Sequence, residues 1–144
     1  MFKDLHIIGA VAQLNFVGHN DHFVPARVDT GARTSAVWAS NIKIVDDELT
    51  FNLFGKSSPY FDGCVISTKE FTSKKVRSTS GFVERRYVVK LPININGRRI
   101  KASFTLANRE HQAYPVLVGR NVLRGKFAVD LKHVSQQITK GRIQ

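Results

Sequence analysis

One acidic residue, Asp29, stands in a short segment whose residue types suit proton transfer by a carboxylate. It is followed by Thr30, Gly31 and Ala32, and residues 26–39 contain no other acid. The apolar flanks predict that this turn lies inside the protein, where a carboxylate needs partners. Gly31 lets the backbone turn, and the Thr30 hydroxyl and following N–H groups could hold the carboxylate in one plane. On these residues alone, a turn aspartate that accepts backbone hydrogen bonds remains an alternative to a catalytic carboxylate.

Other kinds of catalytic or metal site find little support in the sequence. It contains no H-E-x-x-H, C-x-x-C, P-loop or G-x-S-x-G motif. His19 and His22 lie three residues apart in an expected loop, a weak pattern for zinc, and we favour a solvated loop there. The single cysteine, Cys64, cannot form an internal disulfide and is expected to be half-buried. Lone cysteines are typical of reducing compartments, so we expect a cytoplasmic protein.

The chain is strongly basic, with 22 Lys and Arg against 11 acids and a formal net charge of +11. This charge favours anionic partners: an acidic peptide, nucleic acid or a membrane surface. The cations are scattered in runs of at most two, which is also typical of an ordinary solvated surface. The aromatic residues do not alternate with the cations as in a stacking platform, so we do not expect nucleic-acid binding. No apolar run is long enough to span a membrane, and the N-terminus is interpreted as a first strand rather than a signal peptide.

Most of the chain has the alternation of β-strands, and its 42% hydrophobic content is typical of a folded domain. We predict one mainly β domain over residues 1–144, loosely ordered from about residue 132. Single strands are expected over residues 5–16, 22–30 and 127–131. Two further strands are expected on either side of an acidic turn at 46–48, and a hairpin is expected with arms 86–95 and 98–107. Asn96-Gly97 would form the hairpin turn. Residues 55–86 are expected to form long hairpin loops, and residues 119–125 a short helix.

Two motifs carry a resemblance to a known family. Residues 28–32, V-D-T-G-A, resemble the active-site loop of retropepsin-like aspartic proteases, and residues 116–123, V-L-V-G-R-N-V-L, resemble their C-terminal helix motif. A closer resemblance, over residues 26–36, 80–86 and 114–120, is to a bacterial and archaeal group labelled ATP-dependent zinc proteases, which are associated with RimK-type ligases. The resemblance covers about residues 7–131. It implies a closed β-barrel with one short C-terminal helix.

The resemblance also implies a mechanism. Aspartic proteases use two carboxylates that share one proton, with one residue activating water and the other polarising the carbonyl. This chain has one Asp-Thr-Gly, so Asp29 would be catalytic only beside Asp29 of a second copy, in a homodimer. Thr30, Gly31 and Ala32 would support the loop, and residues 55–81 would supply a flap. Despite the group's label, we see no residues for zinc or ATP, and we expect no metal site and no cofactor.

Arg33 departs from the retroviral pattern, which often has an acid after D-T-G-A. Together with Arg85 and Arg86, Arg33 makes an acidic peptide the natural substrate guess, although a structural ion pair of Arg33 is an equal alternative. The resemblance assigns Gly119 and Arg120 to the fold and the dimer. Association with glutamate ligases would suit a glutamate-rich substrate. The alternative functions are a non-catalytic dimeric peptide-binding or adaptor module and, less favoured, a nucleic-acid-binding barrel.

Overall fold

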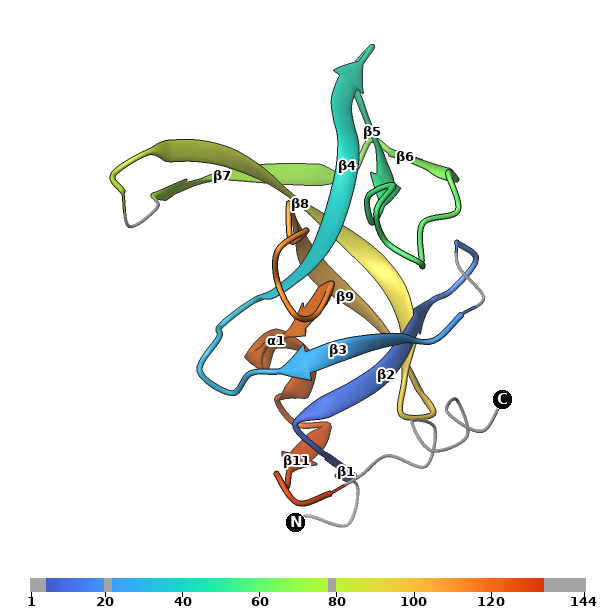
Figure 1. Ribbon diagram of the computed structural model, residues 1–144, viewed down its shortest axis with the longest axis vertical. Coiled ribbons are helices and arrows are strands. Elements are labelled where there is room, and N and C mark those ends of the chain that lie inside the picture. The colour runs from blue at the N-terminus through green and yellow to red at the C-terminus, as the bar shows by residue number, and fades with distance from the viewer. Residues whose placement is uncertain (1–4, 20–21, 78–79, 134–144) are drawn as a thin grey trace.

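The computed structural model describes residues 5–19, 22–77 and 80–133, so nearly all of the tail expected from residue 132 lies outside the described residues. The described residues form eleven strands and one short helix (Figure 1). In chain order the elements are β1 (His6–Ile8), β2 (Val11–Phe16), β3 (Val24–Val28), β4 (Ser35–Val45), β5 (Glu48–Leu53), β6 (Val65–Thr68), β7 (Phe71–Arg77), β8 (Val83–Ile95), β9 (Arg98–Ala107), β10 (Val116–Val118), α1 (Arg120–Leu123) and β11 (Phe127–Val129).

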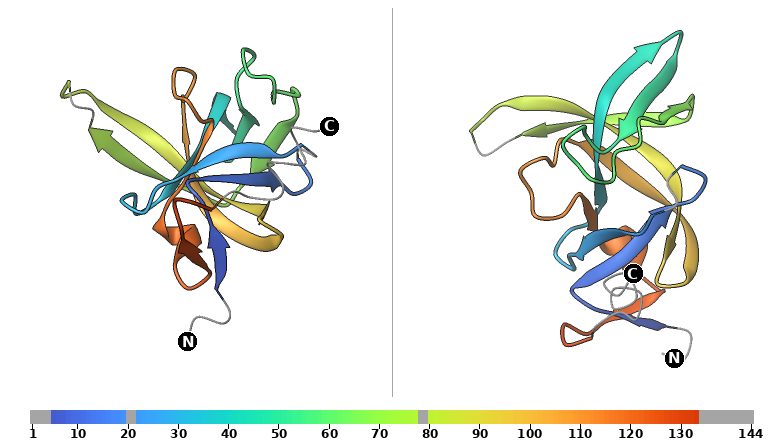
Figure 2. Two further views of the ribbon diagram at one scale, coloured as in Figure 1. Left: turned by 60° about the horizontal axis from the view of Figure 1, so that its bottom comes forward. Right: turned by 45° about the vertical axis from the view of Figure 1, so that its right-hand side comes forward.

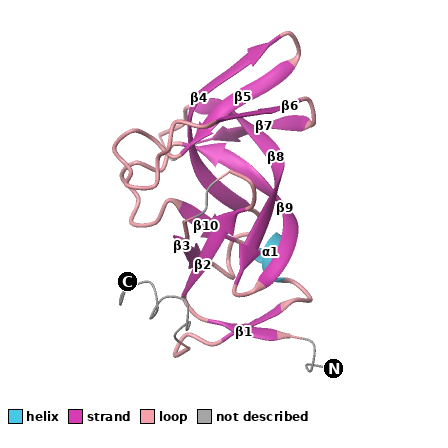
Figure 3. Ribbon diagram, turned by 90° about the vertical axis from the view of Figure 1, so that its right-hand side faces the viewer, coloured by secondary structure: helices cyan, strands magenta, loops and turns pink. Residues whose placement is uncertain are grey.

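Six of these strands close into a barrel. Their order is β10-β3-β2-β8-β9-β4, and β4 pairs again with β10 to complete the ring. The β4–β9 and β10–β3 pairs are parallel, and the other four pairs are antiparallel. The expected mainly β fold, a closed barrel with one short helix, is therefore confirmed. Figure 3 shows how little of the molecule the helix occupies.

The barrel strands form because their apolar residues alternate. In β2 every second side chain is buried, and β3 also turns alternate residues into the barrel. The hairpin predicted at Asn96-Gly97 is present, with Ile95 opposite Arg98. Both turn residues have positive φ, 48° and 78°, the conformation that Asn and Gly tolerate best.

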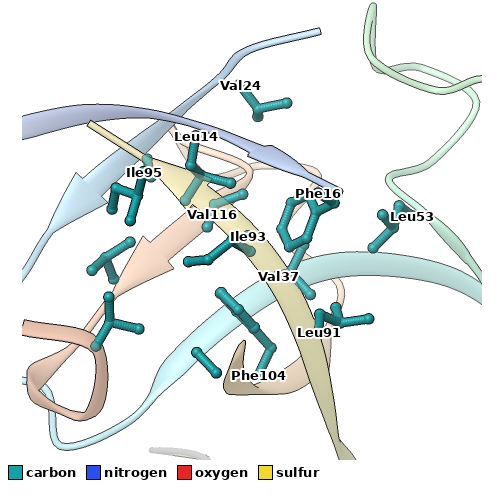
Figure 4. Packing of buried hydrophobic residues seen from close by; sticks show 14 of the residues in the cluster. Leu14, Phe16, Val24, Val37, Leu53, Leu91, Ile93, Ile95, Phe104 and Val116 are labelled. Atoms are coloured by element: carbon teal, nitrogen blue, oxygen red, sulfur yellow. The ribbon is translucent and has the colours of Figure 1, made fainter. Parts of the chain in front are cut away.

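Large aromatic and branched side chains fill the barrel interior (Figure 4). Phe16 of β2 and Phe104 of β9 pack edge to face with ring centroids 5.5 Å apart, and both are fully buried. Phe54, which follows β5, is also fully buried and packs edge to face against Phe16. This core holds the strand ends that carry the chemistry at fixed positions.

Two hairpins project from the barrel (Figures 1 and 2). β4 continues beyond the barrel to Val45 and returns as β5 through a turn at Asp46-Asp47, where both residues have positive φ. β7 pairs with the first half of β8 from Phe71 opposite Val89 to Arg77 opposite Val83. The hairpin expected within residues 55–86 is present, but the expectation of loops is wrong, because this stretch contains the regular strands β6, β7 and the start of β8. In β7 no residue is fully buried, so the strand lacks the apolar alternation that predicts one.

The expected first strand over residues 5–16 is divided into two. β1 pairs with β11 in a separate two-stranded parallel sheet, while β2 belongs to the barrel. The division falls at Gly9, where a β-carbon would collide with the carbonyl group of His133. Glycine is therefore needed for this close approach of two chain segments.

A buried serine joins the start of β4 to the start of α1. The Ser35 hydroxyl accepts a hydrogen bond from the Gly119 N–H at 2.9 Å and donates one to Asn121 Oδ1 at 2.7 Å. The Asn121 amide in turn donates to the Ser103 carbonyl of β9 at 3.0 Å. Ser35 is fully buried, so the Gly119 N–H would have no alternative partner in water.

We predict that Ser35→Ala lowers the free energy of unfolding by about 1–3 kcal/mol, because it leaves the buried Gly119 N–H without an acceptor. Urea denaturation of the two proteins measures the difference. Ser67→Ala removes a hydroxyl from an exposed position of β6 and is the matched control, with an expected change within about 0.5 kcal/mol. Equal effects of the two substitutions would contradict the role given to Ser35.

Candidate active site

Asp29 is the first residue after β3, and its backbone is fixed by β10. β10 lies between β3 and β4, parallel to the first and antiparallel to the second. The Asp29 N–H donates to the Val118 carbonyl at 2.9 Å, which extends the β3–β10 ladder by one bond. The carboxylate is thus attached to the edge of a closed barrel and not to an independent loop.

Within the turn, the carboxylate has one recorded partner. The Gly31 N–H donates to Asp29 Oδ1 at 2.9 Å, and the Ala32 N–H donates to the Asp29 carbonyl at 3.2 Å. The Thr30 hydroxyl makes no recorded hydrogen bond to the carboxylate, contrary to expectation. The turn is also not buried: Asp29 is partly exposed, and Thr30 and Gly31 are exposed. The apolar flanks enter the core and leave the turn itself at the protein surface.

Arg120 and Gly119 support this turn from the side of α1. Arg120 Nη1 donates to the Thr30 carbonyl at 3.0 Å, and the Arg120 N–H donates to the Ala32 carbonyl at 2.8 Å. Gly119 allows the close approach, because a β-carbon there would lie 2.8 Å from the Ala32 carbonyl oxygen and closer still to the Thr34 carbonyl. Both residues therefore hold the shape of the turn.

Arg33 is exposed beside the turn. Its carbonyl accepts a hydrogen bond from the Asn121 N–H at 3.2 Å. Its guanidinium has no acidic partner among the described residues, so the structural ion pair considered for Arg33 is not found there. The positive charge is available to a bound molecule.

Arg85 and Arg86 lie on the β7–β8 hairpin, away from the turn. Arg85 Nη1 donates to Ser73 Oγ at 2.7 Å, and Arg86 Nε donates to Glu84 Oε1. In Figures 1 and 2 this hairpin extends on the same side of the molecule as the turn between β3 and β4. β7 lies within residues 55–81, where a flap is expected, and the flap itself remains a prediction.

Sequence patterns do not identify three residues whose buried or long-range contacts the structure reveals. Ser35 and Asn121 are the first two, and their contacts join segments 84 or more residues apart, which no local pattern reveals. The third is Arg109, which is partly buried and donates from Nε to the Tyr114 carbonyl at 3.0 Å. Burial, and to a smaller degree the positive charge of Arg86, lower the pKa of Arg109. A basic residue in a polar loop gives no sequence signal of such a position.

The remaining candidates lie outside the site. Cys64 is exposed rather than half-buried, because it follows a surface turn in which its N–H donates to Asp62 Oδ1. The described residues contain no group of three His, Cys, Asp or Glu side chains that could hold a metal ion. No helix in the described part of the chain has the length and apolar character that a membrane crossing needs.

Known proteins resemble this chain in sequence and in fold. A protein of unknown function from Legionella pneumophila, Lpg0085, has a crystal structure that superposes with a TM-score of 0.69 at 25% identity, over 90% of this chain and 96% of that one. A protein of Shewanella halifaxensis named "Probable alpha-L-glutamate ligase" is 30% identical over 134 residues, which are 90% of this chain but 29% of that protein.

A protein of the same name from Parasynechococcus marenigrum is 31% identical over 128 residues, 86% of this chain and 28% of that protein. The chain thus spans less than a third of the length of these curated relatives. The model of the RimB-like family, described as retropepsin-like aspartic endopeptidase RimB, matches residues 7–140. Because this match covers nearly the entire barrel with its Asp-Thr-Gly turn, the chain belongs to the RimB-like family of retropepsin-like aspartic endopeptidases.

Proposed function

We propose that this protein is an aspartic endopeptidase that works as a homodimer, and that it cleaves acidic, glutamate-rich peptides. The observation that carries the proposal is the Asp-Thr-Gly turn on the barrel edge. It presents one carboxylate at the surface with a single N–H donor, and the sequence contains one Asp-Thr-Gly. A second copy is the natural source of the missing carboxylate.

In the proposed dimer the two Asp29 carboxylates share one proton, because like charges held so close cannot both ionise. The charged carboxylate takes a proton from water as the water oxygen attacks the peptide carbonyl carbon. The protonated carboxyl gives its proton to the carbonyl oxygen. When the resulting tetrahedral intermediate collapses, the C–N bond breaks, and the carboxyl that took the water proton gives it to the leaving nitrogen. A hydroxyl of the intermediate returns its proton to the other carboxylate, so that the pair again shares one proton. The Gly31 N–H orients one oxygen of each carboxylate throughout.

The preference for acidic substrates is supported by charge. The formal net charge is +11, and Arg33 places an unpaired cation beside the turn. The names of the curated relatives refer to a ligase that acts with glutamate, and this chain matches a minor segment of each. A peptidase segment carried by such a protein would meet glutamate-rich chains as neighbours. We extend that substrate class to this chain.

We predict that Asp29→Asn lowers the rate of cleavage of an oligoglutamate peptide at least about 100-fold, since it removes the group that accepts and donates protons. Peptide products are measured by mass spectrometry between pH 4 and pH 7. Asp62→Asn, at an exposed turn, is the matched control and should cleave as wild type does.

Two results would contradict the proposal. Equal cleavage by Asp29→Asn and wild type would exclude the aspartic mechanism. Tight peptide binding with no cleavage by wild type would favour the alternative, a non-catalytic peptide-binding module.

We also predict that Arg33→Gln lowers kcat/KM for an acidic peptide about 3- to 10-fold at low salt and that the loss shrinks at high salt, where exposed charges are screened. A neutral peptide with the same backbone should be affected less. Arg27→Gln removes an exposed charge from β3 and is the control. An equal loss for acidic and neutral peptides would show that Arg33 has no part in charge selection.

A further inference from the structure

The β7–β8 hairpin places cations directly opposite one another. Lys74 pairs with Arg86, and Lys75 pairs with Arg85. Like charges at directly opposite positions of an antiparallel pair repel each other and destabilise it. Side chains of neighbouring positions point to opposite faces of a strand, so Lys74 and Arg86 share one face and Lys75 and Arg85 the other. The Glu84–Arg86 ion pair offsets part of this repulsion on the face of Lys74 and Arg86. A bound anion would offset the remainder.

A third cation joins Lys74 and Arg86 at the root of the hairpin. Val88 of β8 lies opposite Thr105 of β9, and β9 ends two residues later. Arg86 therefore lies two residues beyond the last β8–β9 pair, and Arg109 is the second residue of the loop that follows β9. Arg86 and Arg109 are also close enough for their charges to interact. Burial lowers the pKa of Arg109, and the charge of Arg86 lowers it further.

One acid offsets part of this charge, because Glu84 forms an ion pair with Arg86. Three cations against one acid still leave the group positively charged. Glu84 accepts only from Arg86 Nε, and the side chain of Glu110 is engaged by Ser57 and His111. Arg109 uses Nε for the Tyr114 carbonyl. In the described part of the chain no acceptor is recorded for the Nη groups of Arg86 and Arg109 or for Lys74 Nζ. The Nη groups of the two arginines are therefore free to bind a carboxylate in the paired geometry that guanidinium groups favour. The Lys74 ammonium is a further free donor.

A cavity of about 330 Å³ lies further along the hairpin towards the barrel, and its lining does not include the three cations themselves. Its lining includes Thr72 and Val88, which are paired across the hairpin and are the next residues on the face that carries Lys74 and Arg86. The lining continues over Lys90 and Ser103 and includes one acid, Glu70. A space large enough for peptide side chains thus begins two residues from Lys74 and Arg86 on the same face.

We infer that Lys74, Arg86 and Arg109 form a carboxylate-binding site at the root of the β7–β8 hairpin, and that this site holds an acidic stretch of the peptide substrate. The inference rests on the proposed function for the identity of the peptide, but not for the existence of the site. The site lies on a different element from the Asp29 turn. It would thus select substrates by their acidic side chains without taking part in bond cleavage.

The test measures binding of fluorescein-labelled hexaglutamate to the Asp29→Asn protein, which cannot consume the peptide. Adding Arg109→Gln or Arg86→Gln should weaken binding about tenfold or more, since each loses a hydrogen bond to a charged group. Arg109→Lys, which keeps the charge without the planar fork, should fall in between. Arg99→Gln, at the opposite end of β9, removes the same charge and should weaken binding less than about twofold. Thermal melts of each variant establish that it is folded.

If Arg109→Gln and Arg86→Gln weaken peptide binding no more than Arg99→Gln does, the proposed site is contradicted. Displacement of the peptide by equimolar inorganic phosphate would assign the site to free oxyanions, and tighter binding of a hexathymidylate would assign it to nucleic acid; either result would overturn the peptide assignment.

Cleavage assays separate this inference from the proposed function. If peptide binding depends on Arg109 but wild type cleaves nothing, the carboxylate-binding site is supported and the proposed peptidase activity is contradicted. If cleavage depends on Asp29 but Arg109→Gln binds the peptide as well as before, the peptidase activity is supported and the carboxylate-binding site is contradicted.

Discussion

The candidate site depends on one short strand. β10 closes the barrel by lying between β3 and β4, and its last residue, Val118, accepts the hydrogen bond that fixes the Asp29 backbone. The next residue, Gly119, approaches Ala32 and Thr34 so closely that no side chain fits. The strand that closes the barrel is therefore the same strand that positions the carboxylate. A change that displaces β10 would disturb stability and chemistry together.

The buried hydroxyl of Ser35 links this closure to the short helix. It satisfies the Gly119 N–H and orders Asn121, which reaches β9. Arg120 extends the same arrangement to the Thr30 carbonyl. With only four residues, α1 has little stability of its own, so tertiary contacts of this kind must hold it. The exposed turn is thereby supported by the rigid barrel, although its own residues are not buried.

The sequence predicts those features that are encoded locally. The Asn96-Gly97 hairpin and the short helix after Gly119 follow from turn residues and apolar spacing. The closed barrel is not encoded locally and is implied by the resemblance that the two family motifs carry. β7 was missed because it is polar on both faces and is held by pairing with β8. The sequence predicts one continuous strand through Gly9. Its close contact is with His133, more than a hundred residues away in the chain, and such a contact leaves no local pattern.

For the site, Asp29 and Arg120 were identified by motif, whereas Ser35 and Arg109 were not, because their environments arise only when distant segments meet. The same reasoning explains the exposure of the Asp29 turn. Apolar flanks indicate that the neighbouring strands enter the core, but they do not say on which side the connection lies. The basic character of the chain was evident from composition, yet its gathering on the β7–β8 hairpin required the strand register.

The central claim is that catalysis needs one Asp29 from each of two copies, and subunit mixing tests it most directly. Wild-type and Asp29→Asn chains are unfolded together in equal amounts, refolded, and assayed for oligoglutamate cleavage. If a mixed pair is inactive, random pairing leaves about a quarter of the activity of the same total amount of wild type. A value of about a half would mean that each chain works alone, and it would contradict the shared site.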